Sequence, residues 1–414
     1  MGQTIIEKII SRNTGQTVMP GDIVTVQVDR VMIHDIFIPF VAEKFKEMGF
    51  TRLWDPDKAV LIYDHLVPAS QVDDTRHFRI GNEFAETYGM KHVHRSDGIC
   101  HQLMTEALYV KPGDIVFGTD SHTTTYGCVG AFSSGIGYTE MASILGTGTM
   151  WIRVPETIKV VIEGTLPSNV TSKDVILRLI GDLRADGATY QALEFCGDTI
   201  ERMTVASRMT MANMAVEAGA KCALFTPDEK TAEYCRIPLT DRERSLTGDE
   251  DAVYSRTLHY RAEDLVPVLA CPSQVDNIHP VRELAGTPID QVFIGSCTNG
   301  RLEDLQRAAA VLKGKKVAPF VKLIVTPASR KVYEQALEDG TLAVLAEAGA
   351  IITHPGCGLC CGRTGGILSD NERVVATNNR NFLGRMGTSK VEIFLASPAT
   401  AAACAAAGKI AVPE

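Results

Sequence analysis

Short runs of apolar and β-branched residues alternate with helical patterns and glycine-bearing turns through most of the chain. The apolar part of each run is four to eight residues long, which is the usual length of a buried strand. The runs cover residues 22–29, 59–65, 114–122, 158–164, 291–300, 321–329 and 350–358. Between them, residues 303–314 and 329–340 show the amphipathic pattern of helices that stop at glycine. This alternation predicts an α/β fold with open sheets.

The length of the chain predicts more than one domain. A single core rarely supports 414 residues, so two or three domains are expected. Breaks near residues 155 and 272 would divide the chain into three α/β domains, with the ranges 1–155, 156–271 and 272–414. The polar stretch 239–257 is expected to be a surface excursion, and the alanine-rich stretch 399–410 a closing helix.

Composition and charge exclude several classes of protein. A net charge of −9 disfavours a general nucleic-acid binder, because such proteins carry basic stripes that meet phosphates. The sequence shows neither a long apolar run for a membrane span nor a secretory signal at its start. Eleven scattered cysteines do not look like a disulfide framework. We therefore expect a protein of the reducing cytoplasm, with no nucleic-acid or membrane partner.

The cysteine spacing indicates a metal centre. Cys357 and Cys360 form a C-x-x-C pair in a glycine-rich loop, and Cys297 stands sixty residues earlier, at the end of a predicted strand. Glycine-bearing loops of this kind can surround an iron–sulfur cluster with backbone N–H groups. A structural zinc would need a fourth ligand such as His354 or Cys361. A redox pair and a group of inert buried thiols stay open as alternatives, and the iron–sulfur cluster is favoured.

Acid and base groups follow two of the predicted strands. Asp64 lies beside His65 at one strand end, and Asp120, Ser121 and His122 follow another. In open α/β sheets, ligands bind beyond the carboxyl ends of the strands. A histidine that transfers protons needs a carboxylate to fix its tautomer and tune its pKa, which these neighbours can supply.

Three further side chains complete the candidate site. His101, in the stretch DGICHQ, could join the groups that transfer protons. Arg380 and Arg385 lie on a glycine-containing loop soon after the C-x-x-C pair. In an acidic protein, such a pair of arginines is suited to clamp carboxylates, although two surface arginines in salt bridges would give the same pattern.

The motifs together resemble a known family. They are VMIHD, YDHLVPA, GICHQ, GTDSHTTTYGCVGAF, RMTMANMAVEAGAK, IGSCTNGRLEDL, PGCGLCC and NNRNFLGR, which run nearly from end to end. The chain resembles the aconitase superfamily, and within it the separate large subunits of 3-isopropylmalate dehydratase and homoaconitase. The resemblance implies three α/β domains with open sheets around a central [4Fe-4S] cluster. The fourth, swivelling domain of the single-chain relatives is absent here.

The resemblance also implies roles for individual residues. It places the cluster on Cys297, Cys357 and Cys360. It assigns proton transfer near a leaving hydroxyl to the pairs Asp64 with His65 and His101 with Asp120, and it places His122 close by. It places Glu194 near the iron with the open coordination position. It assigns contacts with substrate carboxylates or hydroxyl to His34, Ser121, Arg380 and Arg385, and it makes Asn299 and Asn379 neighbours of the cluster.

The implied activity is that of a hydro-lyase acting on a hydroxy-dicarboxylate. A cluster held by three thiolates leaves one iron able to act as a Lewis acid. We expect 3-isopropylmalate as substrate, with homocitrate or homoaconitate, 2,3-dimethylmalate, 2-methylmalate and maleate as alternatives. The missing domain implies a separate small subunit, which would bring a catalytic serine base and another arginine in a heterodimer or heterotetramer.

Two departures from the family pattern concern the substrate. Cys361 adds a thiol beside a predicted ligand, and Ala206 with Ser207 replace an acidic residue and glycine before the RMT motif. They indicate a branch away from the enzymes of leucine biosynthesis.

Two other classes of function compete with the enzyme. An iron-sensing RNA-binding protein is disfavoured by the negative charge. An electron carrier would have four cysteine ligands in place of a ring of histidines and aspartates.

Overall fold

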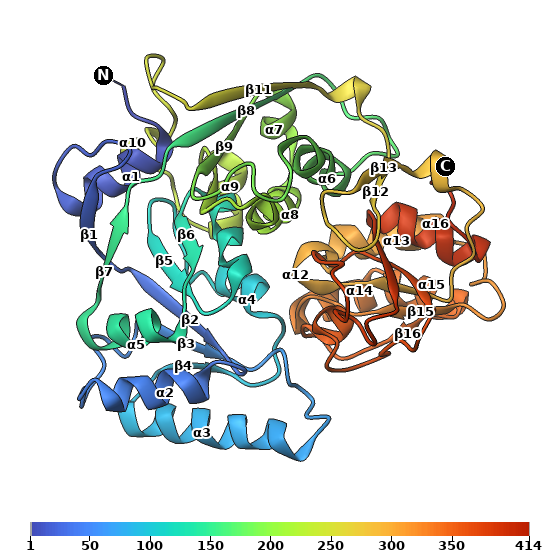
Figure 1. The fold of residues 1–414 in the computed structure, drawn as a ribbon, viewed down its shortest axis with the longest axis horizontal. Coiled ribbons are helices and arrows are strands. Elements are labelled where there is room, and N and C mark those ends of the chain that lie inside the picture. The colour runs from blue at the N-terminus through green and yellow to red at the C-terminus, as the bar shows by residue number, and fades with distance from the viewer. Residues whose placement is uncertain (1, 414) are drawn as a thin grey trace.

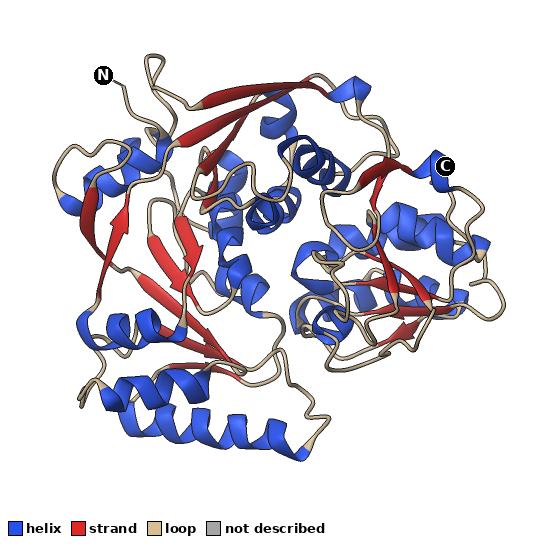
Figure 2. Ribbon diagram, viewed as in Figure 1, coloured by secondary structure: helices blue, strands red, loops and turns tan. Residues whose placement is uncertain are grey.

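Three open sheets form the frame of the protein in a computed structural model that describes residues 2–413. Figure 1 shows their arrangement, and Figure 2 shows the helices that cover their faces. The strands of the first sheet lie within residues 30–135, those of the second within 157–261 and those of the third within 268–395. The predicted α/β class with open sheets is confirmed.

The first sheet is wholly parallel and has the strand order β4-β3-β2-β5-β6. Its strands are β2 (Arg30–His34), β3 (Ala59–Ile62), β4 (His92–His94), β5 (Ile115–Gly118) and β6 (Phe132–Gly135). Its helices are α2 (Ile38–Glu47), α3 (Val72–Tyr88), α4 (Cys100–Glu106), the 3-10 helix η1 (Ser121–Val129) and α5 (Tyr138–Thr147). The strand order turns from one direction to the other between β2 and β5, which makes this position the switch point of the sheet.

The central strand β2 was not among the runs that we expected to be strands. The expected run at residues 22–29 forms β1 (Ile23–Gln27), which follows α1 (Ile5–Thr14) and pairs only with β7 (Thr149–Arg153) in a separate antiparallel ribbon. Burial alternates along β1, whereas four of the five residues of β2 are buried. A central parallel strand must be buried on both faces, and the polar residues of β1 prevent that.

The second sheet is parallel as well, with the order β10-β9-β8-β11. Its strands are β8 (Thr157–Glu163), β9 (Ala192–Cys196), β10 (Cys222–Phe225) and β11 (Arg256–Arg261). The helices of this unit are α6 (Ser172–Leu183), α7 (Asp198–Arg202), α8 (Val205–Met214), η2 (Ala215–Ala218), α9 (Glu229–Cys235) and α10 (Asp241–Arg244). The polar stretch 239–257, expected on the surface, includes α10. It is fixed to α1, because the ammonium of Lys8 in α1 donates to the carbonyls of Ser245 and Thr247.

The third sheet has the order β13-β12-β18-β17-β14-β15-β16. Its strands are β12 (Val268–Ala270), β13 (Ile278–Pro280), β14 (Gln291–Ile294), β15 (Lys322–Val325), β16 (Ile351–Ile352), β17 (Arg373–Ala376) and β18 (Glu392–Leu395). The helices are η3 (Ala262–Asp264), α11 (Val281–Leu284), α12 (Ser296–Asn299), α13 (Leu302–Leu312), α14 (Arg330–Glu338), α15 (Thr341–Ala348), η4 (Gly358–Cys361) and α16 (Pro398–Ala407). None of the described helices is long and apolar enough to span a bilayer. The strand β12 precedes the break expected near residue 272 but pairs with β18, so the third sheet begins earlier than expected.

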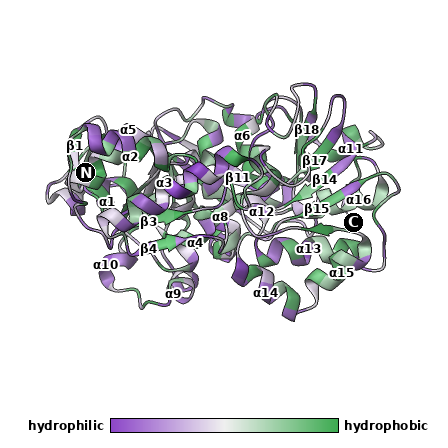
Figure 3. Ribbon diagram, turned by 90° about the horizontal axis from the view of Figure 1, so that it is seen from below, coloured by the Kyte–Doolittle hydropathy of each residue, from purple (hydrophilic) through white to green (hydrophobic). Residues whose placement is uncertain are grey.

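A shared apolar core joins the three units. It contains Met32 of the first sheet, Ile158 of the second and Phe293 of the third, all fully buried. Figure 3 shows hydrophobic colour along the strands and more hydrophilic colour on outer helices such as α3 and α14. Since the units share one core, the loops between them are fixed relative to one another, as a site built from distant segments requires.

One acidic pair at the edge of the first unit predicts a pH effect on stability. Burial and the nearby Asp29 raise the pKa of Asp114 to about 7, so the folded state holds a proton that the unfolded state releases. The stabilising effect of that proton is present at low pH and is lost as the pH rises through the folded-state pKa. We expect Asp114→Asn to raise the free energy of unfolding by about 4 kcal/mol at pH 8, where the rise of the pKa from its usual value to about 7 acts in full, and by less than half of that at pH 5.

Urea titrations of the Asp114→Asn variant and the parent protein at several pH values measure this difference. The asparagine can still accept the hydrogen bond that Asp114 receives from the Lys111 backbone, which limits the change to the charge. Parallel curves of stability against pH for the two proteins would contradict the assignment.

Candidate active site

Residues predicted to transfer protons, and His34, which was predicted to bind substrate, lie together at the carboxyl edge of the first sheet. His34 is the last residue of β2, Asp64 and His65 follow β3, and Asp120 follows β5. These strands are neighbours, with β2 between β3 and β5. The side chains therefore gather at the switch point of the sheet, where open α/β folds bind ligands.

The third sheet brings its residues together in the same way. Cys297 lies in the short helix α12 directly after β14, and Arg380 follows β17, the strand next to β14. The loop that carries Cys357 follows β16. The backbone N–H of Cys357 donates to the carbonyl of Asp64 at 2.9 Å, so the cysteine loop and the first sheet's edge meet. Figure 1 places the third unit beside the first two, with α12 and α4 facing each other.

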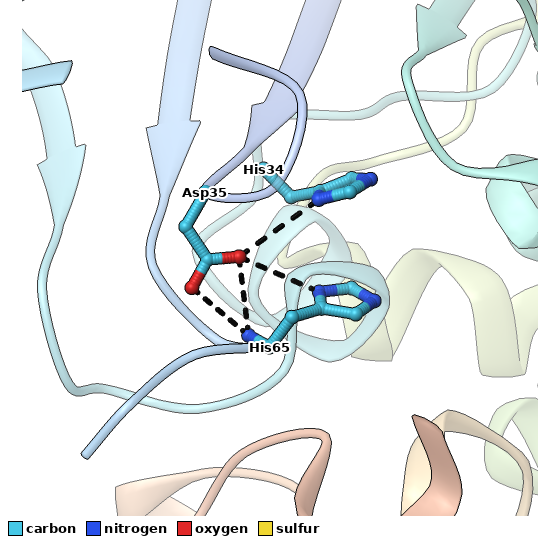
Figure 4. Close-up of side chains that lie close together, drawn as sticks. All are labelled: His34, Asp35 and His65. Carbon is cyan, nitrogen blue, oxygen red and sulfur yellow. Dashed lines mark hydrogen bonds and ion pairs between the residues drawn. The ribbon is translucent and has the colours of Figure 1, made fainter. Parts of the chain in front are cut away.

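The first histidine is held by two aspartates. The Nδ1 atom of His65 lies 2.7 Å from a carboxylate oxygen of Asp64. The Asp35 carboxylate accepts the backbone N–H groups of His65 and Leu66, at 3.1 and 2.8 Å, and the His34 ring stacks on the His65 ring with centroids 4.4 Å apart (Figure 4). Burial alone would lower the pKa of His65, but the Asp64 charge and hydrogen bond outweigh it and raise the pKa well above its usual value. The ring therefore holds a proton.

Asp120 is the acceptor shared by the other histidines. Its carboxylate lies 2.8 Å from Nε2 of His101, 3.3 Å from Nδ1 of His122 and 3.8 Å from Nε2 of His65. Burial would raise the pKa of Asp120, but the hydrogen bonds from His101 and His122 hold it well below its usual range. Burial lowers the pKa of His101 in spite of Asp120. One site thus holds a charged histidine and a neutral one, which is how acid and base roles are separated.

A glutamate that we did not select from the sequence lies within this network. The carboxylate of Glu217 lies 2.7 Å from Nε2 of His122 and 2.8 Å from Nε of Arg380. Burial would raise its pKa, but these two partners hold it below the usual value. Glu217 therefore links the histidines of the first unit with the arginine loop of the third.

The predicted metal ligands converge around one asparagine. The Asn379 side-chain amide donates to Sγ of Cys297 at 3.3 Å, and its oxygen lies 3.7 Å from Sγ of Cys360. A guanidinium nitrogen of Arg385 lies 3.6 Å from Sγ of Cys360. The hydrogen bond from Cys357 lowers the pKa of the Cys360 thiol, and although burial opposes this, the nearby Arg385 charge helps to hold it well below its usual range.

These residues fit an iron–sulfur cluster. Cys297, Cys357 and Cys360 are all buried and reduced, and all eleven cysteines are free thiols. A cationic guanidinium and an amide donor face the sulfur atoms, as the negative charge of a thiolate-bound cluster requires. Gly358 and Gly362 adopt left-handed backbone conformations, with φ of 60° and 67°, which lets the short loop turn between its thiols.

Cys361 differs from its neighbours in its surroundings. Its sulfur lies 4.0 Å from the carbonyl of His65 and 3.8 Å from that of Gly358. A hydrogen bond with the Cys357 thiol lowers the pKa of Cys361 to about 7, although burial opposes this shift. Neither Asn379 nor Arg385 donates to it in the described part of the chain. The Asn379 side chain, which contacts Cys297, therefore also contacts Cys360 but not Cys361.

A cavity of about 680 Å³ opens beside this network. Asp120, Ser121 and Arg380 line it together with the apolar side chains of Phe37 and Ile136. Polar groups that converge in a partly apolar cavity are typical of a site for a small molecule.

The comparison with protein families decides what kind of protein this is. A model of the aconitase family (aconitate hydratase) matches residues 7–408, which is almost the whole chain. The chain belongs to the aconitase family. The prediction of an aconitase-type enzyme is therefore confirmed, and membership of the family implies an iron–sulfur cluster.

Curated proteins similar to this aconitase-family chain match it from end to end. The 3-isopropylmalate dehydratase large subunit 1 of Methanopyrus kandleri is 50% identical over 100% of this chain and 99% of its own length. The 3-isopropylmalate dehydratase large subunit 2 of Archaeoglobus fulgidus is 47% identical over the same shares. The probable methanogen homoaconitase large subunit of Methanothermobacter thermautotrophicus is 44% identical over 99% of this chain and 97% of its own.

A solved structure supports the fold of the aconitase-family chain. The holo-form of aconitase X from Thermococcus kodakaraensis aligns with a TM-score of 0.51 at 14% identity. The alignment covers 86% of this chain and 84% of that one. At this identity the likeness shows the fold alone.

The structure corrects the expected position of Glu194. Its carboxylate accepts the backbone N–H of Ile5 at 2.9 Å and the hydroxyl of Tyr254 at 2.6 Å. Ile5 is the first residue of α1, and Tyr254 lies between α10 and β11. Neither belongs to the loops that carry Cys297, Cys357 and Cys360. Glu194 lies in β9 of the second sheet, opposite Leu224 of β10. Because its carboxylate accepts the N–H of Ile5, the first residue of α1, Glu194 holds α1 against this sheet.

Glu217, and not Glu194, contacts the predicted histidines and arginines of this aconitase-family chain. The sequence contains a signal for it: Asn213 and Glu217 stand four residues apart in an apolar stretch, which puts them on one helical face. The Asn213 side chain also reaches the site, since its oxygen accepts from Asn379 at 3.2 Å.

The remaining predicted residues divide between the site and its surroundings. The Ser121 hydroxyl lies 3.5 Å from Nδ1 of His122 and lines the cavity. The Nε2 atom of His34 is buried without a hydrogen-bond partner among the described residues. The Asn299 amide donates to Asp304 at 2.9 Å, so its recorded contacts are with the helix after Cys297 and with Thr210, and not with a thiol.

Proposed function

We propose that the chain is the large subunit of a hydro-lyase that carries a [4Fe-4S] cluster on Cys297, Cys357 and Cys360. The observation that carries the proposal is the convergence of three thiols with paired histidines and carboxylates beside one cavity. An electron carrier has no need of that acid–base network. When bound, such a cluster supplies an iron with an open coordination position, which acts as a Lewis acid on hydroxyl and carboxylate oxygens.

The side chains of the chain supply the proton transfer. His65 holds a proton because Asp64 raises its pKa, and within residues 2–413 the Asp120 carboxylate, at 3.8 Å, is the partner recorded for its Nε2. It is therefore suited to protonate a hydroxyl as it leaves. The neutral ring of His101, oriented by Asp120, is suited to accept a proton when the reaction runs toward hydration.

The substrate is held by charge and by hydrogen bonds. Arg380 lines the cavity, and Arg385 lies beside the thiol of Cys360. Both guanidinium groups are suited to bind carboxylates. Ser121 and His34 offer hydrogen bonds to a carboxylate or hydroxyl oxygen. Glu217 and His122 hold Arg380 in place.

We assign 3-isopropylmalate as the substrate. Large subunits named for 3-isopropylmalate dehydratase share 44–50% identity with the chain over its full length, and they include the two relatives of 47 and 50%, whereas the homoaconitase relative shares 44%. The malate backbone common to all candidate substrates is what the arginines and Ser121 would bind. The departures at Ala206 and Cys361, which indicated another branch, are outweighed by this identity.

We also propose a separate small subunit as partner. The relatives that match the chain end to end are named large subunits, which implies such a partner for each of them. The small subunit would bring the base that removes the proton from carbon and would contact the variable group of the substrate. A place in the cytoplasm stays a prediction from the sequence.

An activity assay tests the proposal. The chain is produced with the small subunit that co-purifies with it, reconstituted with iron and sulfide without oxygen, and mixed with 3-isopropylmalate. We expect ultraviolet absorbance of the alkene product to appear, with kcat/KM higher than for homocitrate, 2,3-dimethylmalate, 2-methylmalate or malate. Preference for another of these acids would replace the substrate, and no turnover of any of them would refute the hydro-lyase.

A further inference from the structure

Lys173 is a buried lysine with no part in the proton transfer described above. It lies in the first turn of α6 with its side chain fully buried. Its ammonium donates to the backbone carbonyls of Thr377 and Asn378, at 2.8 and 2.6 Å. Lys173 therefore connects the second unit to the segment that directly precedes Asn379 and Arg380.

Several features make this position costly for a lysine. No ion pair of Lys173 occurs within residues 2–413, because its ammonium contacts only carbonyl groups. The neighbouring Asp174 is occupied by the backbone N–H groups of Thr171 and Val268. A cation in the first turn of a helix also opposes the helix dipole. An unpaired buried charge costs several kcal/mol by general estimates, so something else must compensate for it.

The negative groups nearest to Lys173 include the predicted metal ligands. Burial lowers the pKa of Lys173 to about 7, and negative charge on Cys360, Asp304 and Cys297 opposes that shift. Asp304 and Asp174 act on Lys173 in the same direction, and the hydrogen bonds that they accept come from the Asn299 amide and from backbone N–H groups. The sulfur atoms of Cys360 and Cys297 are thus part of the negative group that a cation at Lys173 balances, together with these two carboxylates.

The segment that Lys173 holds carries both halves of the site. Asn379, the next residue after Asn378, reaches the sulfur atoms of Cys297 and Cys360. Arg380 follows and is bound to Glu217. A shift of the two carbonyls would therefore displace the thiol contacts and the arginine together.

We propose that Lys173 is a positioning residue that holds the 377–380 segment in place and supplies the buried countercharge of the metal centre. This inference rests on the proposed cluster. It accounts for a lysine in an otherwise unfavourable place: the cluster and its thiolates bring the negative charge that compensates for the burial of the ammonium. Arg385 is the second cation, in direct contact with Cys360.

The inference predicts effects of opposite sign in the metal-free and the loaded chain. In Lys173→Met, the metal-free chain loses an unpaired buried charge, so its melting temperature should stay the same or rise. The loaded chain loses the countercharge, so iron should leave to a chelator roughly 10-fold faster. The reduction potential of the cluster should also become more negative, because Arg385 is then the one cation of the pair left to favour the reduced form.

Two further variants separate charge from hydrogen bonding and from general damage. Lys173→Gln keeps a donor for one carbonyl but removes the charge, and should lose iron nearly as fast as Lys173→Met. Lys230→Met is the matched control, since the ammonium of Lys230 in α9 also donates to two backbone carbonyls, those of Glu201 and Met203, at the end of α7. It should leave iron loss and the reduction potential unchanged.

The measurements are iron release to a chelator, followed by absorbance, potentiometric titration of the cluster, and thermal unfolding of the metal-free chains. Unchanged iron release and potential in both Lys173 variants would overturn the inference. So would a metal-free chain that fails to fold in both, because that result assigns Lys173 to the structural core. None of these measurements needs a substrate, so they can fail while the proposed dehydratase activity is confirmed.

Discussion

Replacing Cys297 with serine is expected to leave a folded chain that cannot keep an iron–sulfur cluster and has no hydro-lyase activity. Cys297 comes from a different loop than Cys357 and Cys360, and it is joined to them through Asn379. Two thiolates of one short loop cannot hold a cluster that needs three. Anaerobic reconstitution followed by visible absorbance and iron analysis measures the loss, which should reduce bound iron to background.

Cys361→Ser is the matched control in the same loop. Asn379 and Arg385 contact the sulfur atoms of Cys297 and Cys360 and not that of Cys361, so this variant should take up iron and show the parent spectrum. If Cys361→Ser loses the cluster and Cys297→Ser keeps it, the ligand set is wrong. A protein that keeps its colour and activity in the Cys297→Ser form would have the same consequence.

Glu217→Gln is expected to lower kcat by roughly 100-fold or more, because acid–base networks of this kind contribute about 10² to 10⁴ to the rate. The substitution preserves the size of the side chain but removes the charge that His122 and Arg380 share. Without it the pKa of His122 falls, and Arg380 loses the partner that positions it. Steady-state kinetics of the reconstituted complex measure the change, and cluster absorbance should stay at the parent level.

A second buried glutamate gives the control for this variant. Glu194 is as buried as a catalytic carboxylate, yet it binds Ile5 and Tyr254. Glu194→Gln should therefore lower thermal stability without changing kcat for folded enzyme. Loss of kcat in Glu194→Gln together with normal turnover in Glu217→Gln would return the role to Glu194.

The positions of the catalytic loops were predictable because they depend on local patterns. Asp64, Asp120 and Cys297 each follow a short apolar run, and a run of that kind is a buried strand whose end carries the ligand. The spacing of Cys357 and Cys360 indicated a metal loop without any knowledge of the fold. These features need only the order of residues along one stretch of chain.

The choice between two glutamates was not predictable in this way. Glu194 is the middle residue of β9, and its contact with the backbone of Ile5 depends on how α1 packs against the second sheet. Glu217 lies in a helical stretch, and its partners are 95 and 163 residues away in sequence. Contacts at such separation follow from the arrangement of whole sheets. The strand β2 was missed for a related reason, since its central place depends on the strands beside it.

The hydrogen bond from the Cys357 backbone N–H to the Asp64 carbonyl joins two residues that are far apart in sequence. Asp64 is therefore synthesised well before Cys357. Domains at the start of a chain generally fold first during synthesis. The first sheet can form early, but the thiols, Asn379 and Arg385 all belong to the last third of the chain. A nascent chain that ends before Cys357 therefore has the histidines and aspartates of the site but only one of the three proposed cluster ligands. We expect the cluster to be inserted only after the last third of the chain has been made.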